Sequence, residues 1–265
     1  MAPTRSAQGV RRRLYAMGTV FNFDIRTPLP EELVDEAVER ACEWLRWVDE
    51  TFSTYKDASD VNRLERGELA VDHCSAELRS VVDLCYELNK VTGGYFDAWA
   101  AGRFDPSGVV KGWSMERASR TLSEHGLVDH CLEGGGDVRL AGSPLWGTGA
   151  PWRVAVRHPV RRDAFCALLD AGPGAVATSG TYERGLHVLN PFTGLPSSEI
   201  LSVSVVGPDL THADAYATAA LAMGPDAPGW LSLLESEGYF SLVVGAAGRG
   251  WSSPGLKRLR AAPKS

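Results

Sequence analysis

The sequence of 265 residues lacks both long apolar runs and an excess of positive charge. No apolar stretch approaches the roughly 20 residues that a membrane-spanning helix needs. The formal net charge is -6, whereas proteins that bind nucleic acids or anionic membranes usually carry a basic face. We therefore expect no nucleic-acid partner and no membrane association.

Paired-cysteine motifs are also missing. The five cysteines are scattered, odd in number and without a Cys-x-x-Cys spacing: Cys42, Cys74, Cys85, Cys131 and Cys166. This usage is typical of reduced thiols in a cytoplasm, and it disfavours a disulfide frame or a zinc site. Arginines at 11–13 could imitate the start of an export signal, but polar residues interrupt the stretch that follows. We expect a cytoplasmic protein.

Common nucleotide-binding and hydrolase motifs are absent as well. The sequence contains no G-x-x-x-x-G-K-[ST] loop, no G-x-S-x-G elbow and no H-E-x-x-H pair. Residues 172–177 match the letters G-x-G-x-x-A, but a dinucleotide site needs a helix to open there, and the following Thr-Ser-Gly-Thr is a poor helix start. We interpret this segment as a turn that enters a strand.

The composition, with 44% hydrophobic and 23% charged residues, is typical of a globular protein. Apolar spacing and capping residues predict helices over 29–49, 75–92, 111–124 and 212–223. An opening strand is predicted over 14–26, with further strands over 137–141, 152–157, 186–189, 201–206 and 240–244. Strands interspersed with a few long helices indicate the α+β class. We expect one domain over residues 1–265, with 257–265 as a disordered basic tail.

Two oxygen-bearing side chains stand four residues apart in the helix predicted over 212–223. Asp214 and Thr218 therefore share a helix face, and hard cations prefer such ligands. Alternatively, Thr211 is the N-cap of this helix and Asp214 its capping-box partner. The spacing alone leaves both interpretations open.

Two glycine-containing segments could approach a ligand closely. Residues 105–113 place Asp105 and Lys111 around a turn just before the helix predicted over 111–124, where backbone amides and an ammonium group suit a phosphate. Residues 133–137, Glu-Gly-Gly-Gly-Asp, form a second flexible bend. Each segment could equally be an ordinary surface turn.

A third segment, residues 177–194, gathers hydroxyl groups, Arg184 and His187 around a short predicted strand that ends in an Asn-Pro turn. Histidine can act as a general base because its ordinary pKa lies near neutral pH. A single histidine can equally have a structural role, so the pattern alone does not decide between the two.

Taken in order, these segments resemble the FAD:protein FMN transferase family, also called the ApbE family. The resemblance spans about residues 14–225. The matching segments lie at 17–19, 52–55, 62–64, 93–97, 105–113, 135–137, 177–194 and 213–218.

The resemblance implies a T-fold-like α+β core, with a mixed or antiparallel sheet packed against a few long helices. It implies transfer of FMN from FAD to a Ser or Thr hydroxyl of a target flavoprotein, with release of AMP. The residues that would line the FAD site are Met17, Tyr55, Phe96, Asp97, Ala98, Asp105, Lys111 and Leu189. Mg²⁺, or alternatively Ca²⁺ or Mn²⁺, would be held by Asp214, Thr218 and the Gly108 carbonyl. His187 would deprotonate the acceptor hydroxyl, and Lys111 would assist by neutralising phosphate charge.

Two other functions are compatible with the same residues. A pyrophosphatase would split FAD into FMN and AMP with water as the acceptor. A non-catalytic FAD-binding protein is suggested by two features: only seven residues separate Asp97 from Asp105, and Glu133 could place a second carboxylate near the phosphates.

Overall fold

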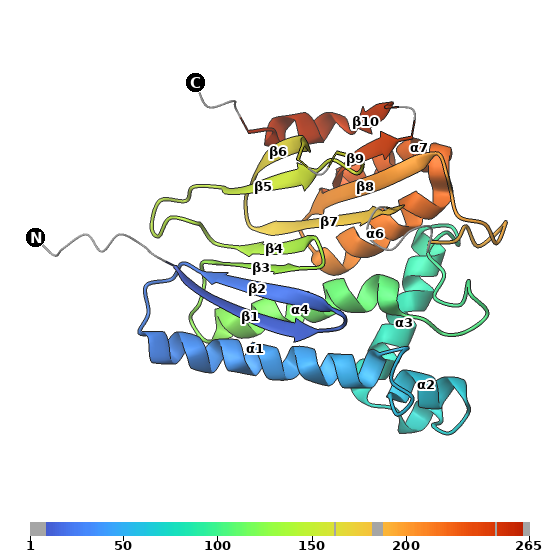
Figure 1. The fold of residues 1–265 in the computed structure, drawn as a ribbon, viewed down its shortest axis with the longest axis horizontal. Helices are drawn as coiled ribbons and strands as arrows, with labels where there is room; N and C mark the ends of the chain where they lie inside the picture. The colour runs from blue at the N-terminus through green and yellow to red at the C-terminus, as the bar shows by residue number, and fades with distance from the viewer. Residues whose placement is uncertain (1–8, 162, 182–187, 247, 262–265) are drawn as a thin grey trace, which may run out of the picture.

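The computed structural model describes residues 9–161, 163–181, 188–246 and 248–261. Within them, an eight-stranded antiparallel sheet has the order β1-β2-β3-β4-β7-β8-β9-β10 (Figure 1). Its strands are β1 (Val10–Ala16), β2 (Thr19–Ile25), β3 (His130–Gly134), β4 (Asp137–Ala141), β7 (Gly174–Gly180), β8 (Ile200–Gly207), β9 (Phe240–Gly245) and β10 (Gly250–Ser252). A separate two-stranded ribbon consists of β5 (Trp152–Arg157) and β6 (Phe165–Ala171).

Helices fill the long connections between strands. They are α1 (Glu31–Phe52), α2 (Asp60–Glu65), α3 (Ala76–Val91), α4 (Ser107–Glu124), α6 (Leu210–Met223) and α7 (Ala227–Leu233), with short 3-10 helices η1 (Val71–His73), η2 (Gly224–Asp226), η3 (Leu234–Glu237) and η4 (Pro254–Leu259). Helix α4 packs between α1 and α6, and α6 packs against β7 and β8. The α+β class is thereby confirmed.

The central sheet is apolar on both faces, because successive side chains of a strand point to opposite sides. In β7, Ala175 and Ala177 join the main core beneath the helices. Val176, between them, packs with Leu169 of the ribbon in a second cluster. The helices therefore cover one face, and the ribbon covers part of the other.

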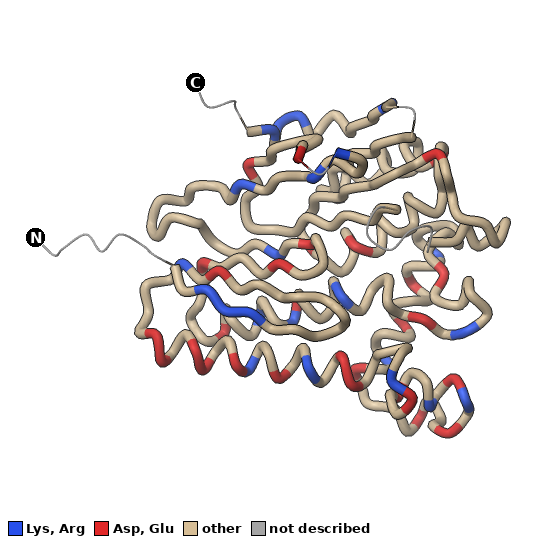
Figure 2. The backbone as a smooth tube through the Cα atoms, viewed as in Figure 1, with Lys and Arg blue, Asp and Glu red and all other residues tan. Residues whose placement is uncertain are grey.

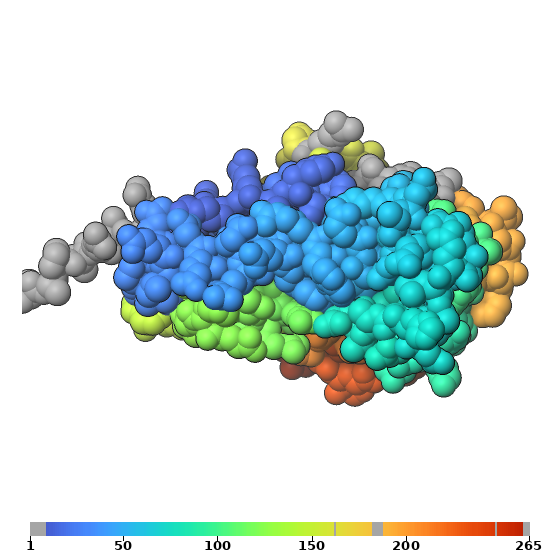
Figure 3. Space-filling view, turned by 90° about the horizontal axis from the view of Figure 1, so that it is seen from below, coloured from blue at the N-terminus to red at the C-terminus, as the bar shows by residue number. Residues whose placement is uncertain are grey.

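Charge is distributed unevenly over the outer helix and the edge strand. Figure 2 shows acidic residues along α1 and basic residues along β1. Arg12 joins the two elements, with its Nη2 atom 2.6 Å from Glu31 Oε1 and 2.7 Å from Asp35 Oδ1. In Figure 3, α1 runs across the face seen from below, between the β1–β2 hairpin and α4. These exposed ion pairs contribute little stability individually.

Several boundaries differ from the sequence-based predictions. The strand predicted over 14–26 is a hairpin, because Met17 (φ 50°) and Gly18 (φ 67°) form a tight turn between β1 and β2. The helix predicted from 111 begins at Ser107, whose amide nitrogen donates to Asp105 Oδ1 at 3.0 Å.

At the chain's end, the predicted tail does not hold for residues 257–261. They belong to η4 or to the segment after it, where Arg260 bridges to Leu169 and the Ala261 amide donates to the Leu168 carbonyl. Residues 262–265 lie outside the described residues.

Two local predictions, the cap of α3 and the strand after the Gly-x-Gly segment, are confirmed. Ser75 caps α3 by accepting from the Leu78 amide at 3.1 Å, and the Gly-x-Gly segment enters strand β7 instead of a helix. The predicted strand over 186–189 falls partly on undescribed residues, and Leu189 forms only an isolated bridge with Pro196. All five cysteines are unpaired. Across the described ranges, the helices are too short or too polar to cross a membrane.

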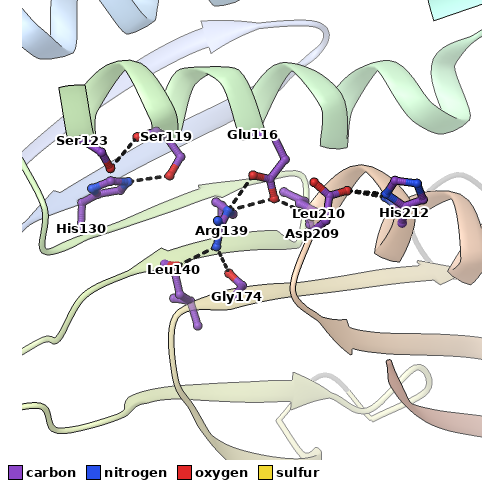
Figure 4. A network of polar contacts seen from close by, with 10 residues as sticks. All are labelled: Glu116, Ser119, Ser123, His130, Arg139, Leu140, Gly174, Asp209, Leu210 and His212. Atoms are coloured by element: carbon purple, nitrogen blue, oxygen red, sulfur yellow. Dashed lines mark hydrogen bonds and ion pairs between the residues drawn. The ribbon is translucent and has the colours of Figure 1, made fainter. Parts of the chain in front are cut away.

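A buried histidine joins β3 to α4. His130 Nδ1 lies 2.6 Å from the Leu127 carbonyl. Its Nε2 atom lies 2.7 Å from Ser119 Oγ, and Figure 4 shows this second contact. Burial disfavours the charged ring and lowers the pKa of His130 to about 4. The folded protein therefore holds this ring neutral at pH 7.

We expect this histidine to make folding sensitive to acid. At pH values below the ordinary histidine pKa of about 6.5, this side chain binds a proton in the unfolded chain but not in the folded chain. Above pH 6.5 the proton affinity of His130 therefore has no effect on the free energy of unfolding. As pH falls from 6.5 towards 4, the free energy of unfolding decreases by roughly 3 kcal/mol in total. Urea unfolding between pH 4 and 7 measures this slope. The slope of unfolding free energy against pH should flatten in His130→Gln. It should persist in the control His125→Gln, which alters an exposed histidine. Equal slopes in wild type and His130→Gln would show that His130 is not the source of the acid sensitivity.

Candidate active site

A cavity of about 360 Å³ opens where three strand ends meet two helices. Gly18 and Thr19 come from the β1–β2 hairpin, Gly135 from the β3–β4 turn, and residues 178–180 from the end of β7. Helices α4 and α6 supply the opposite wall. Because neighbouring strands are antiparallel, these turns lie at the same end of the sheet, and residues far apart in sequence meet there.

Most of the residues expected at the site lie around this cavity. Those that line it are Phe96, Asp97, Ala98, Asp105, Gly108, Lys111, Leu189, Asp214 and Thr218. Met17 belongs to the β1–β2 turn but does not line the cavity. Tyr55 is 92% exposed and does not line it either. His187 lies outside the described residues.

One lysine stands between two buried carboxylates. Lys111 Nζ lies 2.6 Å from Asp137 Oδ2 and 3.8 Å from Asp214 Oδ2. The Asp137 side chain is 0% exposed and that of Asp214 is 5% exposed. Charges interact more strongly here than at the surface, because little water screens them. With both carboxylates ionised, the three groups carry a net charge of about -1, which suits binding of an additional cation.

Hydroxyl groups complete this part of the cavity. Thr218 lies one turn after Asp214 on α6, and its Oγ1 is 3.0 Å from Ser179 Oγ of β7. A Cβ added to Gly108 would lie 3.6 Å from Thr218 Cγ2, so α4 passes beside Thr218 at this point. Carboxylate and hydroxyl oxygens thus lie in the same part of the cavity, and such donors fit a hard cation.

The arrangement has few acidic or nitrogen ligands. No group of three His, Cys, Asp or Glu side chains with metal-binding geometry occurs among the described residues. A cation at Asp214 would therefore depend on hydroxyl, carbonyl or substrate oxygens for its remaining ligands.

Asp137 ends the glycine-rich segment 133–137, and the sequence analysis does not predict it as a site residue. The bend is the β3–β4 turn, with Gly135 at φ 57° and Gly136 at φ 86°, and it delivers Asp137 to Lys111. The Asp137 Oδ1 atom also accepts from the Thr178 amide at 2.9 Å, which ties β4 to β7. An acid directly after a glycine turn was the available signal, but its partner could not be inferred from spacing.

The structure also corrects the capping alternative for Asp214. The N-cap of α6 is Asp209, whose Oδ1 accepts from the His212 amide at 2.9 Å. Thr211 lies inside the helix, so Asp214 is not the partner of a Thr211 cap. Capping therefore does not explain the buried carboxylate of Asp214.

Glu133 does not place a second carboxylate in the cavity. Its neighbours in β3, Leu132 and Gly134, are buried, whereas Glu133 is half-buried and does not line the cavity. Its Oε2 atom accepts from Asn22 Nδ2 at 2.6 Å. One of the two features that suggested non-catalytic FAD binding is therefore absent from the site.

Comparisons with known proteins identify one family. The sequence matches the profile of the ApbE family over residues 17–102 and 99–242. It is 33% identical over 132 residues to an FAD:protein FMN transferase of Vibrio cholerae, covering 46% of this chain and 39% of that protein. It is 29% identical over 174 residues to the protein of the same name in Escherichia coli, covering 61% and 48%. The matched part thus spans less than half the length of these curated relatives.

Solved structures show the same fold. A crystal structure of the ApbE protein from Thermotoga maritima superposes with a TM-score of 0.83 at 23% identity, covering 96% of this chain and 100% of that one. The flavin transferase ApbE from Vibrio cholerae gives a TM-score of 0.80 at 22% identity, covering 96% and 99%. At this identity the likeness concerns the fold.

Proposed function

Because the chain belongs to the ApbE family, we propose that it transfers the FMN group of FAD to a Ser or Thr hydroxyl of a target flavoprotein and releases AMP. The observation that carries this proposal is the position of Lys111 between Asp137 and Asp214 in one cavity, beside the hydroxyls of Thr218 and Ser179. Phosphoryl transfer depends mainly on positioning and on neutralising charge, and these groups supply both.

Asp214, Thr218 and the Gly108 carbonyl would hold Mg²⁺. When bound, the ion would neutralise charge on the pyrophosphate oxygens and orient them. Ca²⁺ and Mn²⁺ also accept oxygen ligands, so the choice of metal follows from measurement.

Lys111 is the cation of this cavity nearest the proposed metal ligands. Its ammonium would contact a pyrophosphate oxygen while Asp137 holds its position from behind. Phe96, Asp97, Ala98, Asp105 and Leu189 line the remainder of the proposed FAD site. Met17 and Tyr55 do not line the cavity, so the cavity itself lends no support to their contact with FAD.

The acceptor hydroxyl needs a base because a neutral Ser or Thr oxygen is a weak nucleophile. We propose that His187 accepts its proton while the acceptor oxygen forms a bond to the FMN phosphorus. The bond from that phosphorus to the bridging oxygen breaks, and AMP leaves with the electron pair. FMN then remains attached through a phosphoester bond.

Replacing His187 by alanine is expected to slow transfer by roughly 100-fold, the lower end of what general-base catalysis contributes. The slope of rate against pH near the histidine pKa should disappear with it. Rates of acceptor flavinylation between pH 5.5 and 8.5 measure both effects, with His158→Ala, a change on the β5–β6 connection, as the control. Unchanged rate and pH dependence in His187→Ala would remove this residue from the mechanism.

Hydrolysis of FAD by the same cavity is the main alternative. It needs no protein acceptor, so it predicts equal release of AMP and FMN with and without a flavoprotein target. Transfer instead predicts AMP release that depends on the acceptor. We further propose that the target is a cytoplasmic flavoprotein, in keeping with the scattered, unpaired cysteines.

A further inference from the structure

A partly buried ion pair outside the cavity lining joins four elements of the fold. Figure 4 shows Glu116 of α4 and Arg139 of β4 beside the first turn of α6. Neither residue lines the cavity. We propose that Glu116 and Arg139 are positioning residues that fix the start of α6 and thereby hold Asp214 at its distance from Lys111. This inference rests on the proposed function of Asp214 and Lys111.

The contacts of the pair are short and span α4, β4, β7 and α6. Glu116 Oε1 accepts from the Leu210 amide at 2.6 Å, and Arg139 Nε donates to Glu116 Oε2 at 2.9 Å. Arg139 Nη1 also donates to the carbonyls of Leu140, at 2.8 Å, and Gly174, at 2.7 Å. Glu116 therefore connects the backbone of α6 to the sheet through Arg139.

Each member of the pair lies close in sequence to a charged group of the cavity. Leu210 precedes Asp214 by four residues, about one helical turn. Arg139 follows Asp137 by two residues and so shares a side of β4 with it. Lys111 lies on α4 a little more than one turn before Glu116. A shift at the pair is therefore transmitted to Asp214, Asp137 and Lys111.

Close packing against α4 fixes the same turn of α6 at a second point. A Cβ added to Gly112 would lie 2.6 Å from the Leu210 carbonyl oxygen and 3.1 Å from Asp214 Cβ. Gly112 is one turn before Glu116 on α4, so the peptide groups of Leu210 are contacted at two successive turns. This leaves little room for α6 to slide along α4 while Glu116 holds the Leu210 amide.

Charge at the helix start makes the Glu116 contact hard to replace. The first amides of a helix lack partners within it, and an anion there is favoured by the helix dipole. Asp209 accepts a hydrogen bond from the His212 amide, and Glu116 accepts one from the Leu210 amide. Burial raises the pKa of Glu116, and Arg139 opposes that change. Removing the carboxylate would leave both a helix amide and a mostly buried guanidinium without this acceptor.

Two substitutions at Glu116 distinguish the effect of its hydrogen bond to the Leu210 amide from the effect of its negative charge. Glu116→Gln keeps an oxygen that can accept from the Leu210 amide, whereas Glu116→Ala removes it. We expect kcat for FMN transfer to fall roughly 10- to 100-fold in Glu116→Ala, the range seen when groups that orient metal ligands are removed. The KM for FAD should change less than about threefold, since the lost interaction acts mainly in the transition state. Glu116→Gln should recover most of kcat.

A second measurement does not depend on turnover. Amide hydrogen exchange over residues 210–218 should accelerate in Glu116→Ala and stay near wild type in Glu116→Gln. Mn²⁺ affinity, measured from the electron paramagnetic resonance signal of free Mn²⁺ with ADP present, should weaken in the alanine variant alone. Leu169→Ala, a buried change in the ribbon, controls for general loss of stability and should leave both measurements unchanged.

The outcomes distinguish this inference from the proposed function. If wild type transfers FMN but Glu116→Ala keeps kcat within twofold and exchanges normally over 210–218, the positioning role is wrong. It is also wrong if glutamine and alanine variants lose kcat equally. If wild type transfers no FMN, the proposed function fails, while hydrogen exchange and Mn²⁺ binding still test the positioning of α6.

Discussion

Replacing Asp214 by asparagine is expected to lower the rate of FMN transfer by roughly 1,000-fold, at the upper end of losses for a group that stabilises transition-state charge. Asparagine has nearly the same volume, so packing between α4 and α6 should persist. The amide lacks the charge that would hold a cation beside Thr218, and it no longer offsets the ammonium of Lys111, 3.8 Å away. Single-turnover AMP release with a flavoprotein acceptor measures the loss.

A structural role for Asp214 predicts something different. If the carboxylate served only the helix, the variant would lose about 1 kcal/mol of stability and keep its transfer rate. Asp170→Asn is a suitable control, because it removes a carboxylate that pairs with Arg153 on the ribbon. Near-wild-type transfer by Asp214→Asn, with the melting temperature lowered, would contradict the assignment of Asp214 as a metal ligand.

The second large effect is expected at Lys111. Lys111→Met should slow transfer by roughly 100- to 1,000-fold, because one cation that would face the pyrophosphate is removed. It should also reduce stability by about 2 kcal/mol, since Asp137 would lose the ammonium 2.6 Å from its buried carboxylate. Urea denaturation and AMP release in the same preparations measure the two losses.

A double variant separates these two effects. In Lys111→Met with Asp137→Asn, the carboxylate that lay 2.6 Å from the ammonium is replaced by a neutral amide and only that of Asp214, 3.8 Å from the same position, remains, so most of the lost stability should return. The transfer rate should stay low, because the cation is still missing. Recovery of the rate together with stability would show that Lys111 supports only the fold and does not act on the phosphates.

The sequence predicts those elements whose signals are local. The helix around α3 follows from apolar spacing and the Ser75 cap, and both appear in the structure. The early start of α4 was missed because Ser107 and Gly108 are poor helix formers. That turn forms because Asp105 accepts from the Ser107 amide and Pro106 precedes the helix.

The site was predicted only as far as single segments allow. Asp214 and Thr218 could be paired because they lie one turn apart on one helix. The contact of Lys111 with Asp137 depends on a long-range pairing, in which the β3–β4 turn returns the chain to α4. Tyr55 was expected at the flavin site by resemblance alone, and its exposed position after α1 could not be anticipated from spacing.

We propose that FMN moves from FAD to a protein hydroxyl in this cavity. The most direct measurement incubates the purified chain with FAD, Mg²⁺ and a flavoprotein carrying a Ser or Thr acceptor, and follows AMP release and covalent flavin on the acceptor by intact-mass spectrometry. We expect equal amounts of AMP and flavinylated acceptor, with little AMP when the acceptor hydroxyl is removed. AMP and free FMN formed at the same rate without any acceptor, or intact FAD after prolonged incubation, would contradict it.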